Sequence, residues 1–342
     1  MSARESIIPV FVPHLGCPND CVFCNQRRIS GSLSPAGPED VINSIENAAA
    51  LTQCGAKRQL AFYGGSFTAI PVPMQEALLG AAQPYLASGF ISSIRLSTRP
   101  DAIDGEVLSR LRRFGVETVE LGAQSMCDRV LALSGRGHTA EDVATASRAV
   151  KDGGFKLILQ MMTGLPGSTD GTDIETASRL AALAPDGVRL YPTVIVRDTA
   201  LYDLWRAGSY RERGVEDAVR VCAAILPIFD AAGIPVIRLG LNPTEELSAG
   251  DAAGGAYHPA LGELVRSRIL LQKAQVLLRG VPQGSAVVLG VRSGLISQMT
   301  GQHGCNKAAL ADSFGLASIK IAQIDAKDDE PRVVSIAKSG NL

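Results

Sequence analysis

The 342-residue sequence has almost no excess charge of either sign, since 33 Lys and Arg nearly balance 34 Asp and Glu. This balance excludes a strongly basic nucleic-acid binder and an acidic tail protein as descriptions of the whole chain. The sequence also lacks an apolar run of about 18 residues, the length that a membrane-spanning helix needs. Residues 1–13 read as a short strand rather than a secretory signal. We therefore expect a cytoplasmic protein without membrane association.

Cysteine is scarce, with seven in the chain, yet Cys17, Cys21 and Cys24 crowd into one short segment. In a reducing compartment such crowding predicts metal or cluster ligation rather than disulfides. A structural zinc site takes four ligands, and neither a fourth cysteine nor a pair of histidines lies close by. A 4Fe–4S cluster held by three cysteines leaves one iron open for another ligand. We prefer the cluster to its alternative, a zinc loop that uses His14 as fourth ligand.

Short apolar runs alternate with longer amphipathic stretches up to about Leu241. This alternation predicts a parallel sheet with helical crossovers, and both a partly closed barrel and an open doubly wound sheet fit it. The expected strands are Ile7–His14, Gln59–Gly64, Ser93–Thr98, Thr118–Ala123, Lys156–Met162, Val188–Val194 and Pro235–Leu239. The expected helices are Pro38–Cys54, Pro73–Leu86, Gly105–Phe114, Thr139–Lys151, Asp173–Leu183 and Val215–Ala231.

The pattern changes after Leu241, where we expect a loop over Asn242–Tyr257, a helix over Leu261–Leu278 and a compact α+β tail. In the tail, Gly301-Gln302-His303-Gly304 resembles the GXXG loop of KH domains, which clamps single-stranded nucleic acid. Its middle residues are not basic, so docking of the module on the rest of the chain is an equal alternative. The predicted domains are residues 1–245, a loop and connecting helix over 246–280, and a KH-like module over 281–342. The expected elements of the module are strands Ser285–Gly290, Ser318–Ile324 and Arg332–Ile336 and helices Gly294–Met299 and Asn306–Phe314.

The segment Gly16-Cys17-Pro18-Asn19-Asp20-Cys21-Val22-Phe23-Cys24 has a Cys-x3-Cys-x2-Cys spacing with an aromatic residue before the last cysteine. This motif resembles the radical S-adenosylmethionine (radical SAM) superfamily. The resemblance implies an α/β fold, a partial (β/α)6 TIM-like barrel, whose cysteine loop follows the first strand and binds a 4Fe–4S cluster. It also implies that SAM binds the open iron. An electron from a donor of the flavodoxin or ferredoxin type then cleaves SAM to a 5′-deoxyadenosyl radical, which abstracts hydrogen from substrate.

Polar and glycine-rich strand ends extend this resemblance, among them Tyr63-Gly64-Gly65-Ser66 and Glu120-Leu121-Gly122-Ala123-Gln124. Over residues 9–208 their order and spacing resemble the radical SAM domain of the elongator catalytic subunit family, which modifies tRNA wobble uridines. Oxygen-independent coproporphyrinogen oxidases are similar more loosely. Structural roles in the core, at strand ends or in solvated loops are the alternative for the predicted contacts. The resemblance implies SAM contacts by Phe23, Gly64, Gly65, Ser66, Ser97, Gln124, Arg136 and Gln160.

The sequence departs from the elongator relatives in its shorter cysteine loop and in ending without room for an acetyltransferase domain. Chemistry that depends on acetyl-CoA is therefore not expected. The leading hypothesis is a radical SAM enzyme that acts on an RNA such as tRNA. The same radical chemistry on a tetrapyrrole-like small molecule or a peptide is the second. A non-enzymatic iron–sulfur redox sensor or RNA-binding scaffold is the third.

Overall fold

The computed structural model describes residues 6–12, 17, 21–25, 36–51, 57–241 and 252–338. The chain forms two compact units, Met1–Gly214 with Ile225–Tyr257 and Val215–Ala224 with His258–Leu342. The predicted domain limits at residues 245 and 280 stay a prediction. Within the described ranges, no helix combines the length and the apolar character that crossing a membrane requires.

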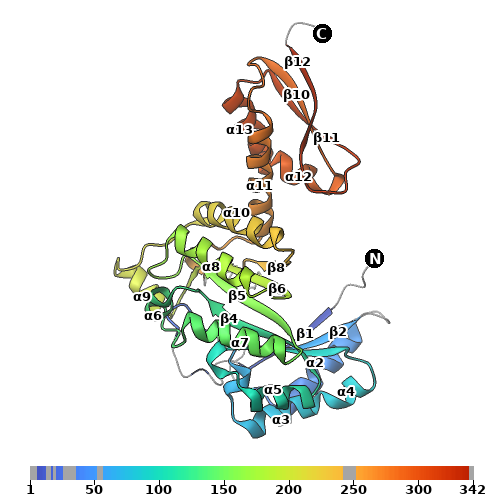
Figure 1. The fold of residues 1–342 in the computed structure, drawn as a ribbon, viewed down its shortest axis with the longest axis vertical. Coiled ribbons are helices and arrows are strands. Elements are labelled where there is room, and N and C mark those ends of the chain that lie inside the picture. Colours follow the sequence, from blue (N-terminus) through green and yellow to red (C-terminus); the bar gives the residue numbers. More distant parts are fainter. Residues whose placement is uncertain are drawn as a thin grey trace. The chain divides into compact units, whose positions relative to one another are not determined.

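Seven strands form the main sheet of the first unit in the order β1-β2-β3-β4-β5-β6-β8 (Figure 1). All neighbouring pairs are parallel. The spatial order follows the chain order without the reversal that a doubly wound sheet contains, so that alternative is excluded. The predicted partial barrel is confirmed, as a curled half-barrel with β1 and β8 at its two ends. Its strands are β1 (Ser6–Phe11), β2 (Arg58–Tyr63), β3 (Ser93–Thr98), β4 (Val116–Gln124), β5 (Lys156–Thr163), β6 (Gly187–Pro192) and β8 (Val236–Leu239).

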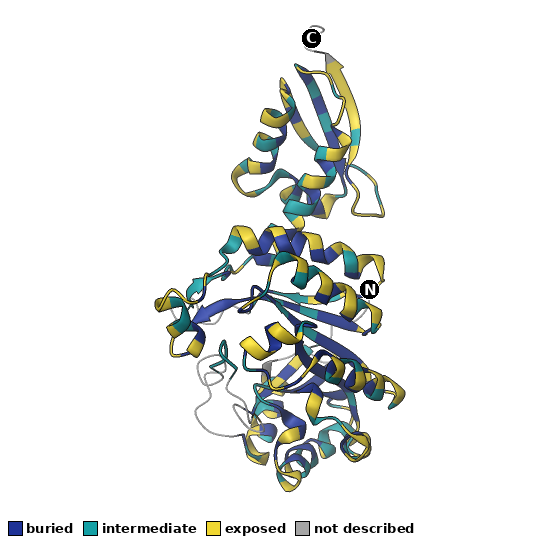
Figure 2. Ribbon diagram, turned by 60° about the vertical axis from the view of Figure 1, so that its left-hand side comes forward, coloured by how far each residue is buried: buried dark blue, intermediate teal, exposed yellow. Residues whose placement is uncertain are grey.

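Helices connect the successive strands, and their apolar sides pack on the sheet while their other sides are exposed (Figure 2). The helices are α2 (Pro38–Leu51), α3 (Val72–Ala81), α4 (Gln83–Ala87), α5 (Gly105–Arg113), α6 (Asp128–Leu133), α7 (Ala140–Asp152), α8 (Asp170–Ala182), α9 (Ala200–Arg206) and α10 (Val215–Ala231). Two 3-10 turns, η1 (Phe67–Ala69) and η2 (Pro100–Ala102), follow β2 and β3.

Alternate residues of the strands point to opposite faces of the sheet, and the two faces differ in polarity. Leu121 and Leu159 are fully buried on the helix-covered face. Their neighbours Glu120 and Gln160 therefore point to the concave face, which we call the lumen. Gln160 lies in register with Arg189 of the next strand, so the two residues share that face. The half-barrel thus has an apolar outer side and a polar lumen.

The second unit contains a small α+β domain with the sheet order β11-β10-β12, in which β10 is parallel to β11 and antiparallel to β12. Leu289, Met299 and Leu310 are fully buried in its core. The expected order of strand, helix, helix and strand is present, with Gly301–Gly304 between the two helices. The elements are α11 (Leu261–Leu277), β10 (Ser285–Val291), η4 (Ser293–Leu295), α12 (Ile296–Thr300), η5 (Gln302–Gly304), α13 (Cys305–Phe314), β11 (Ser318–Gln323) and β12 (Arg332–Lys338).

Two of the expected elements, one strand and one loop, are wrong. The strand expected over Val188–Val194 is interrupted after Pro192, and β7 (Val194–Val196) is a separate strand. The loop expected over Asn242–Tyr257 contains β9 (Ala252–Gly255), which pairs antiparallel with β7. Because β9 consists of alanine and glycine, it has no alternating pattern, and pairing with β7 sets its conformation. Helices α6 and α9 were not expected, since six and seven residues are too short for a clear helical period.

Candidate functional site at the carboxyl edge of the half-barrel

The cysteine loop after β1 is anchored to two other parts of the first unit by backbone hydrogen bonds. The N–H of Cys24 donates to the Cys21 carbonyl at 2.9 Å and closes a turn. Between them, Val22 donates to the carbonyl of Ser134 at 3.1 Å and accepts from the N–H of Leu201 at 2.7 Å. Ser134 follows α6 and Leu201 begins α9, so the loop lies at the carboxyl edge of the sheet.

Phe23 contributes to the packing of this loop. Its ring packs against an apolar cluster built on Ile195, Leu201 and Tyr210. The hydroxyl of Tyr210 in turn donates to the carbonyl of Gly164 at 2.6 Å. Phe23 is partly buried in this packing, and its contact with the adenine of SAM stays a prediction.

Arg136 joins the cysteine loop to β4. Its guanidinium donates from Nη1 to Cys21 Sγ at 3.2 Å and from Nη2 to the Gly122 carbonyl at 2.7 Å. The side chain is buried, and it places a fixed positive charge beside one of the three thiols. A guanidinium in this position suits both a thiolate and the carboxylate of an amino-acid ligand.

Gln124 ends β4 in a strained backbone conformation, with φ at +63°. Its residue is buried, yet its Oε1 has no hydrogen-bond partner within the described ranges. Strained non-glycine residues and orphaned buried acceptors both concentrate at ligand sites. A Cβ added at Gly122 would lie 3.1 Å from both Gln124 Nε2 and Arg136 Nη2, so the glycine leaves these two side chains room to approach.

Gly122→Ala is expected to weaken SAM binding about 10-fold, because the added methyl must displace two buried polar groups at the proposed SAM site. Gly105→Ala is the matched control, since a Cβ there meets nothing within 4 Å. Equilibrium binding of SAM to the cluster-loaded protein is the measurement. Equal affinities of the two variants would contradict a role for Gly122 and its neighbours in SAM binding.

The glycine pair after β2 adopts a turn that only glycine tolerates at its first position, with φ of +93° at Gly64. The next side chain, Ser66, is buried, and its Oγ lies 3.0 Å from Thr98 Oγ1 and accepts from the Arg99 N–H at 3.2 Å. The hydroxyl of Ser66 thus ties the turn to the end of β3. Backbone groups of Gly64 and Gly65 remain the proposed SAM contacts.

Sequence reasoning missed the most buried ionic group of the lumen, Glu120, whose side chain is 0% exposed. Its Oε1 accepts from Arg95 Nη1 at 2.9 Å, from Arg189 Nη2 at 3.1 Å and from the Tyr63 hydroxyl at 3.3 Å. Its Oε2 lies 2.9 Å from Arg189 Nε and accepts from Gln160 Nε2 at 3.0 Å. One carboxylate of β4 therefore joins side chains from four other strands, β2, β3, β5 and β6. The available signal was a charged residue between two apolar residues of the strand, Val119 and Leu121.

This lumen network fixes the orientation of the predicted SAM contact Gln160. Because its Nε2 donates to Glu120 and lies 3.5 Å from Ser97 Oγ, its Oε1 is the group left to accept from a ligand. The arrangement also keeps Tyr63 a neutral phenol. Burial and the neighbouring Glu120 raise the pKa of Tyr63 to about 12.

His138 has a buried, neutral imidazole. Its Nε2 lies 3.2 Å from the carbonyl oxygen of Ala123, the residue before Gln124. Burial and the charge of Arg136 lower its pKa from 6.5 to about 4. Since its pKa is lower in the folded than in the unfolded state, the unfolded state takes up the proton first. His138 therefore destabilises the fold as pH falls from about 6.5 to about 4.

We compare the unfolding free energies of the iron-free wild type and of His138→Gln. Between pH 7 and pH 4, the wild type should lose about 3 kcal/mol more than the variant. Urea denaturation of both proteins at several pH values tests this. Taking the difference in unfolding free energy between the two proteins cancels the contributions of all other titrating groups. One of these is Asp173, whose buried carboxyl has a pKa raised to about 6 and which therefore stabilises the fold as pH falls. A difference that does not vary with pH would contradict the assignment.

The three predicted cluster ligands differ in exposure: Cys17 is exposed, whereas Cys21 and Cys24 are half-buried. Among the described residues, no three His, Cys, Asp or Glu side chains converge at metal-binding distance. Residues 13–16 and 18–20, with His14 among them, lie outside the described part. The donor chemistry nevertheless fits an iron–sulfur cluster, since three thiols share one loop and a cation lies beside one of them.

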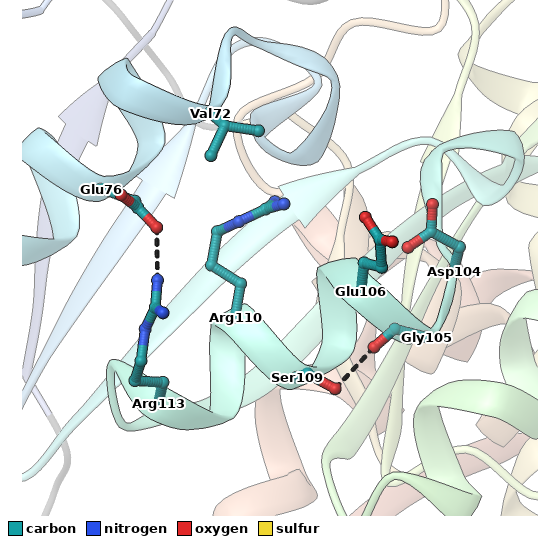
Figure 3. Close-up of a pocket in the computed structure, with 8 residues that line it drawn as sticks. All are labelled: Val72, Glu76, Asp104, Gly105, Glu106, Ser109, Arg110 and Arg113. Atoms are coloured by element: carbon teal, nitrogen blue, oxygen red, sulfur yellow. Dashed lines mark hydrogen bonds and ion pairs between the residues drawn. The ribbon is translucent and has the colours of Figure 1, made fainter.

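A groove in the described part lies elsewhere, between α3 and α5 (Figure 3). It measures about 980 Å³ and is lined by charged helix residues, with an ion pair of Glu76 and Arg113 across it. None of the predicted site residues lines this groove. Its charged groups are those of two outer helices, so it is not the candidate site.

Three features together define a radical SAM protein. They are a half-barrel of parallel strands in chain order, a three-cysteine loop after the first strand and a glycine pair after the second. Residues 11–180 match the Radical SAM superfamily, and residues 185–270 match the Radical_SAM C-terminal domain. The chain belongs to the radical SAM superfamily of enzymes.

Among known proteins, the chain resembles human Elongator complex protein 3, with 32% identity over 179 residues that cover 52% of this chain and 32% of the human protein. It is 33% identical over 129 residues to the tRNA uridine(34) acetyltransferase of Methanocaldococcus infernus, covering 37% of this chain and 24% of that protein. The chain thus spans less than half of these relatives.

Two solved structures share the fold. The archaeal Methanocaldococcus infernus Elp3 with an N-terminal deletion has a TM-score of 0.62 and 22% identity, over 82% of this chain and 66% of that one. Coproporphyrinogen III oxidase (HemN) of Escherichia coli has a TM-score of 0.50 and 20% identity, over 68% of this chain and 53% of that one.

Proposed function

We propose that the chain is an enzyme in which Cys17, Cys21 and Cys24 bind a 4Fe–4S cluster and SAM binds the open iron. When bound, the cluster and SAM supply a 5′-deoxyadenosyl radical that abstracts a hydrogen atom from substrate. The observation that carries this proposal is the group at the carboxyl edge, where Arg136 contacts Cys21 and the buried Gln124 keeps an acceptor open.

The chain's own residues would hold SAM by complementary charge and hydrogen bonding. Arg136 suits the SAM carboxylate, because a guanidinium forms two parallel hydrogen bonds to a carboxylate. Gln124 Oε1 and the backbone after Gly64 suit the SAM ammonium. Gln160 Oε1, kept free because Glu120 engages the amide nitrogen, suits a ribose hydroxyl. These roles need no rearrangement of the lumen network.

We further propose that the substrate is an RNA, in particular a tRNA. Curated relatives at 32–33% identity include proteins named Elongator complex protein 3 and tRNA uridine(34) acetyltransferase. The turn Gly301–Gly304 resembles a GXXG loop in its backbone, since both glycines have positive φ, +77° at Gly301 and +78° at Gly304. An electron donor of the flavodoxin or ferredoxin type stays a prediction.

The test measures 5′-deoxyadenosine with and without tRNA. The anaerobically reconstituted protein is reduced with dithionite and given SAM, and product is counted by mass spectrometry, together with the nucleosides of the tRNA. We expect addition of tRNA to increase the yield of 5′-deoxyadenosine. In the same tRNA, one unmodified nucleoside should decrease in amount while a heavier nucleoside appears. Ribosomal RNA is the control. SAM cleavage that no tRNA stimulates, with unchanged nucleosides, would contradict the RNA substrate.

A small-molecule substrate is the second candidate, and the near-neutral charge of the chain favours it, because RNA affinity depends strongly on positive charge. The same assay with a cell extract of small metabolites decides between them. Extract-dependent 5′-deoxyadenosine without any change in tRNA would favour this candidate.

A further inference from the structure

The lumen of the half-barrel contains more cationic than anionic side chains. Arg95 and Arg189 both form ion pairs with one carboxylate, Glu120. Arg238 lies in register with Arg189, and its Nε donates to the backbone carbonyl of Gly240 at 2.9 Å, with no carboxylate paired to it among the described residues. Glu117, near the amino end of β4, does not offset these charges because Lys156 pairs with it at 2.9 Å. Among the described residues, the three guanidiniums are thus matched by one carboxylate, which pairs with two of them.

No other group of the network carries negative charge at neutral pH. Burial raises the pKa of both Tyr63 and Tyr191, so both hydroxyls stay neutral. The guanidinium of Arg189 also lies over the ring of Tyr63, with Cζ 5.5 Å from the ring centroid. A ring stabilises a cation without neutralising it. The excess positive charge therefore remains in a poorly solvated place, where an unpaired cation is unfavourable.

The two paired arginines are accessible from the lumen, unlike the carboxylate that holds them. Side-chain exposure is 11% for Arg95 and 14% for Arg189, against 0% for Glu120. They are also separate from Arg136, the residue proposed for the SAM carboxylate. Arg136 bonds the carbonyl of Gly122, which is two residues closer to the carboxyl end of β4 than Glu120. The arginine pair thus lies deeper in the lumen than Arg136, with Arg189 level with Gln160, the residue proposed for the SAM ribose.

We infer that the lumen contains an anion-binding site in which Arg189 and Arg95 receive a phosphate or a carboxylate of the substrate. Glu120 is the positioning residue of this site: it orients both guanidiniums and leaves one positive charge for the ligand. Such a site would hold the anionic end of the substrate deeper in the lumen than the proposed contact of Arg136 with the SAM carboxylate. The inference deepens the proposed function, on which the identity of the ligand as substrate rests, but anion binding itself does not require SAM cleavage.

The test measures binding of inorganic phosphate and of propionate to the full chain by calorimetry and thermal shift, at constant ionic strength. Arg189→Gln is expected to weaken binding about 10-fold, since it removes a charge-assisted contact. Glu120→Gln is expected to tighten binding, because it removes the competing carboxylate. Arg148→Gln is the matched control, since Arg148 is an exposed arginine that pairs with Glu141. These opposite changes would support the site.

Tighter phosphate binding would indicate a nucleotide as the ligand, and tighter propionate binding a carboxylated small molecule. No binding of either anion, or equal binding by Arg189→Gln and Arg148→Gln, would overturn the inference. If Glu120→Gln does not fold, Arg189→Lys replaces it. Lysine keeps the charge but loses the planar fork of the guanidinium, so its affinity should lie between those of wild type and Arg189→Gln. A loss as large as in Arg189→Gln would overturn the site. Anion binding without SAM cleavage would refute only the proposed function.

Discussion

Cys21→Ala is expected to lower both iron–sulfur content and 5′-deoxyadenosine formation more than about 100-fold. Even changes to outer-shell partners of a metal site cost about 10–100-fold, and this substitution removes a proposed direct ligand and the acceptor of Arg136 Nη1. The other two cysteines alone cannot hold the cluster, so Cys17→Ala and Cys24→Ala should behave alike. Iron and sulfide analysis, visible absorption and mass spectrometry of the reaction mixture measure the effect.

The matched control is Cys305→Ala, which alters an exposed cysteine at the start of α13 in the small α+β domain. It should retain the cluster and the product. A Cys21→Ala protein with full iron content and undiminished product would refute the ligand assignment. Zinc in place of iron in the wild type, lost from all three loop variants, would instead establish the structural-zinc alternative.

Glu120→Ala is expected to lower the free energy of unfolding by about 3–5 kcal/mol, the range for removing one partner of a buried ion pair. The substitution leaves Arg95 and Arg189 without their carboxylate in a lumen that cannot hydrate them well. It also frees Gln160 Nε2, so the predicted SAM contact loses its fixed orientation. Urea denaturation of the iron-free protein measures stability separately from catalysis.

Glu117→Ala is the control from the same strand. Glu117 pairs with Lys156 at 2.9 Å, but both side chains are largely solvated, at 42% and 57% exposure. Exposed ion pairs contribute about 0–1 kcal/mol, so this variant should be nearly as stable as wild type. Similar losses of unfolding free energy in Glu120→Ala and Glu117→Ala would mean that the lumen network stabilises the fold no more than a surface ion pair does.

Much of the fold followed from periodicity. The strands expected over Ser93–Thr98 and Lys156–Met162 are present as β3 and β5 with limits equal or within one residue, and α10 has the expected limits. Periodicity failed at β9, where alanine and glycine carry no pattern and the partner strand sets the conformation. Periodicity could not distinguish a barrel from a doubly wound sheet, because the local pattern of hydrophobic residues does not determine the order of strands in a sheet.

The sequence by itself determined the class of the protein, since the cysteine spacing, the glycine pair and each polar strand end are short motifs of consecutive or nearby residues. Only the tertiary structure decided which side chains meet. Glu120 contacts Arg95 from 25 residues away and Arg189 from 69 residues away. Local residue types decide which side of a strand is buried, whereas strand register and sheet curvature decide which charges face each other in the lumen. The cationic lumen is therefore a property of the fold.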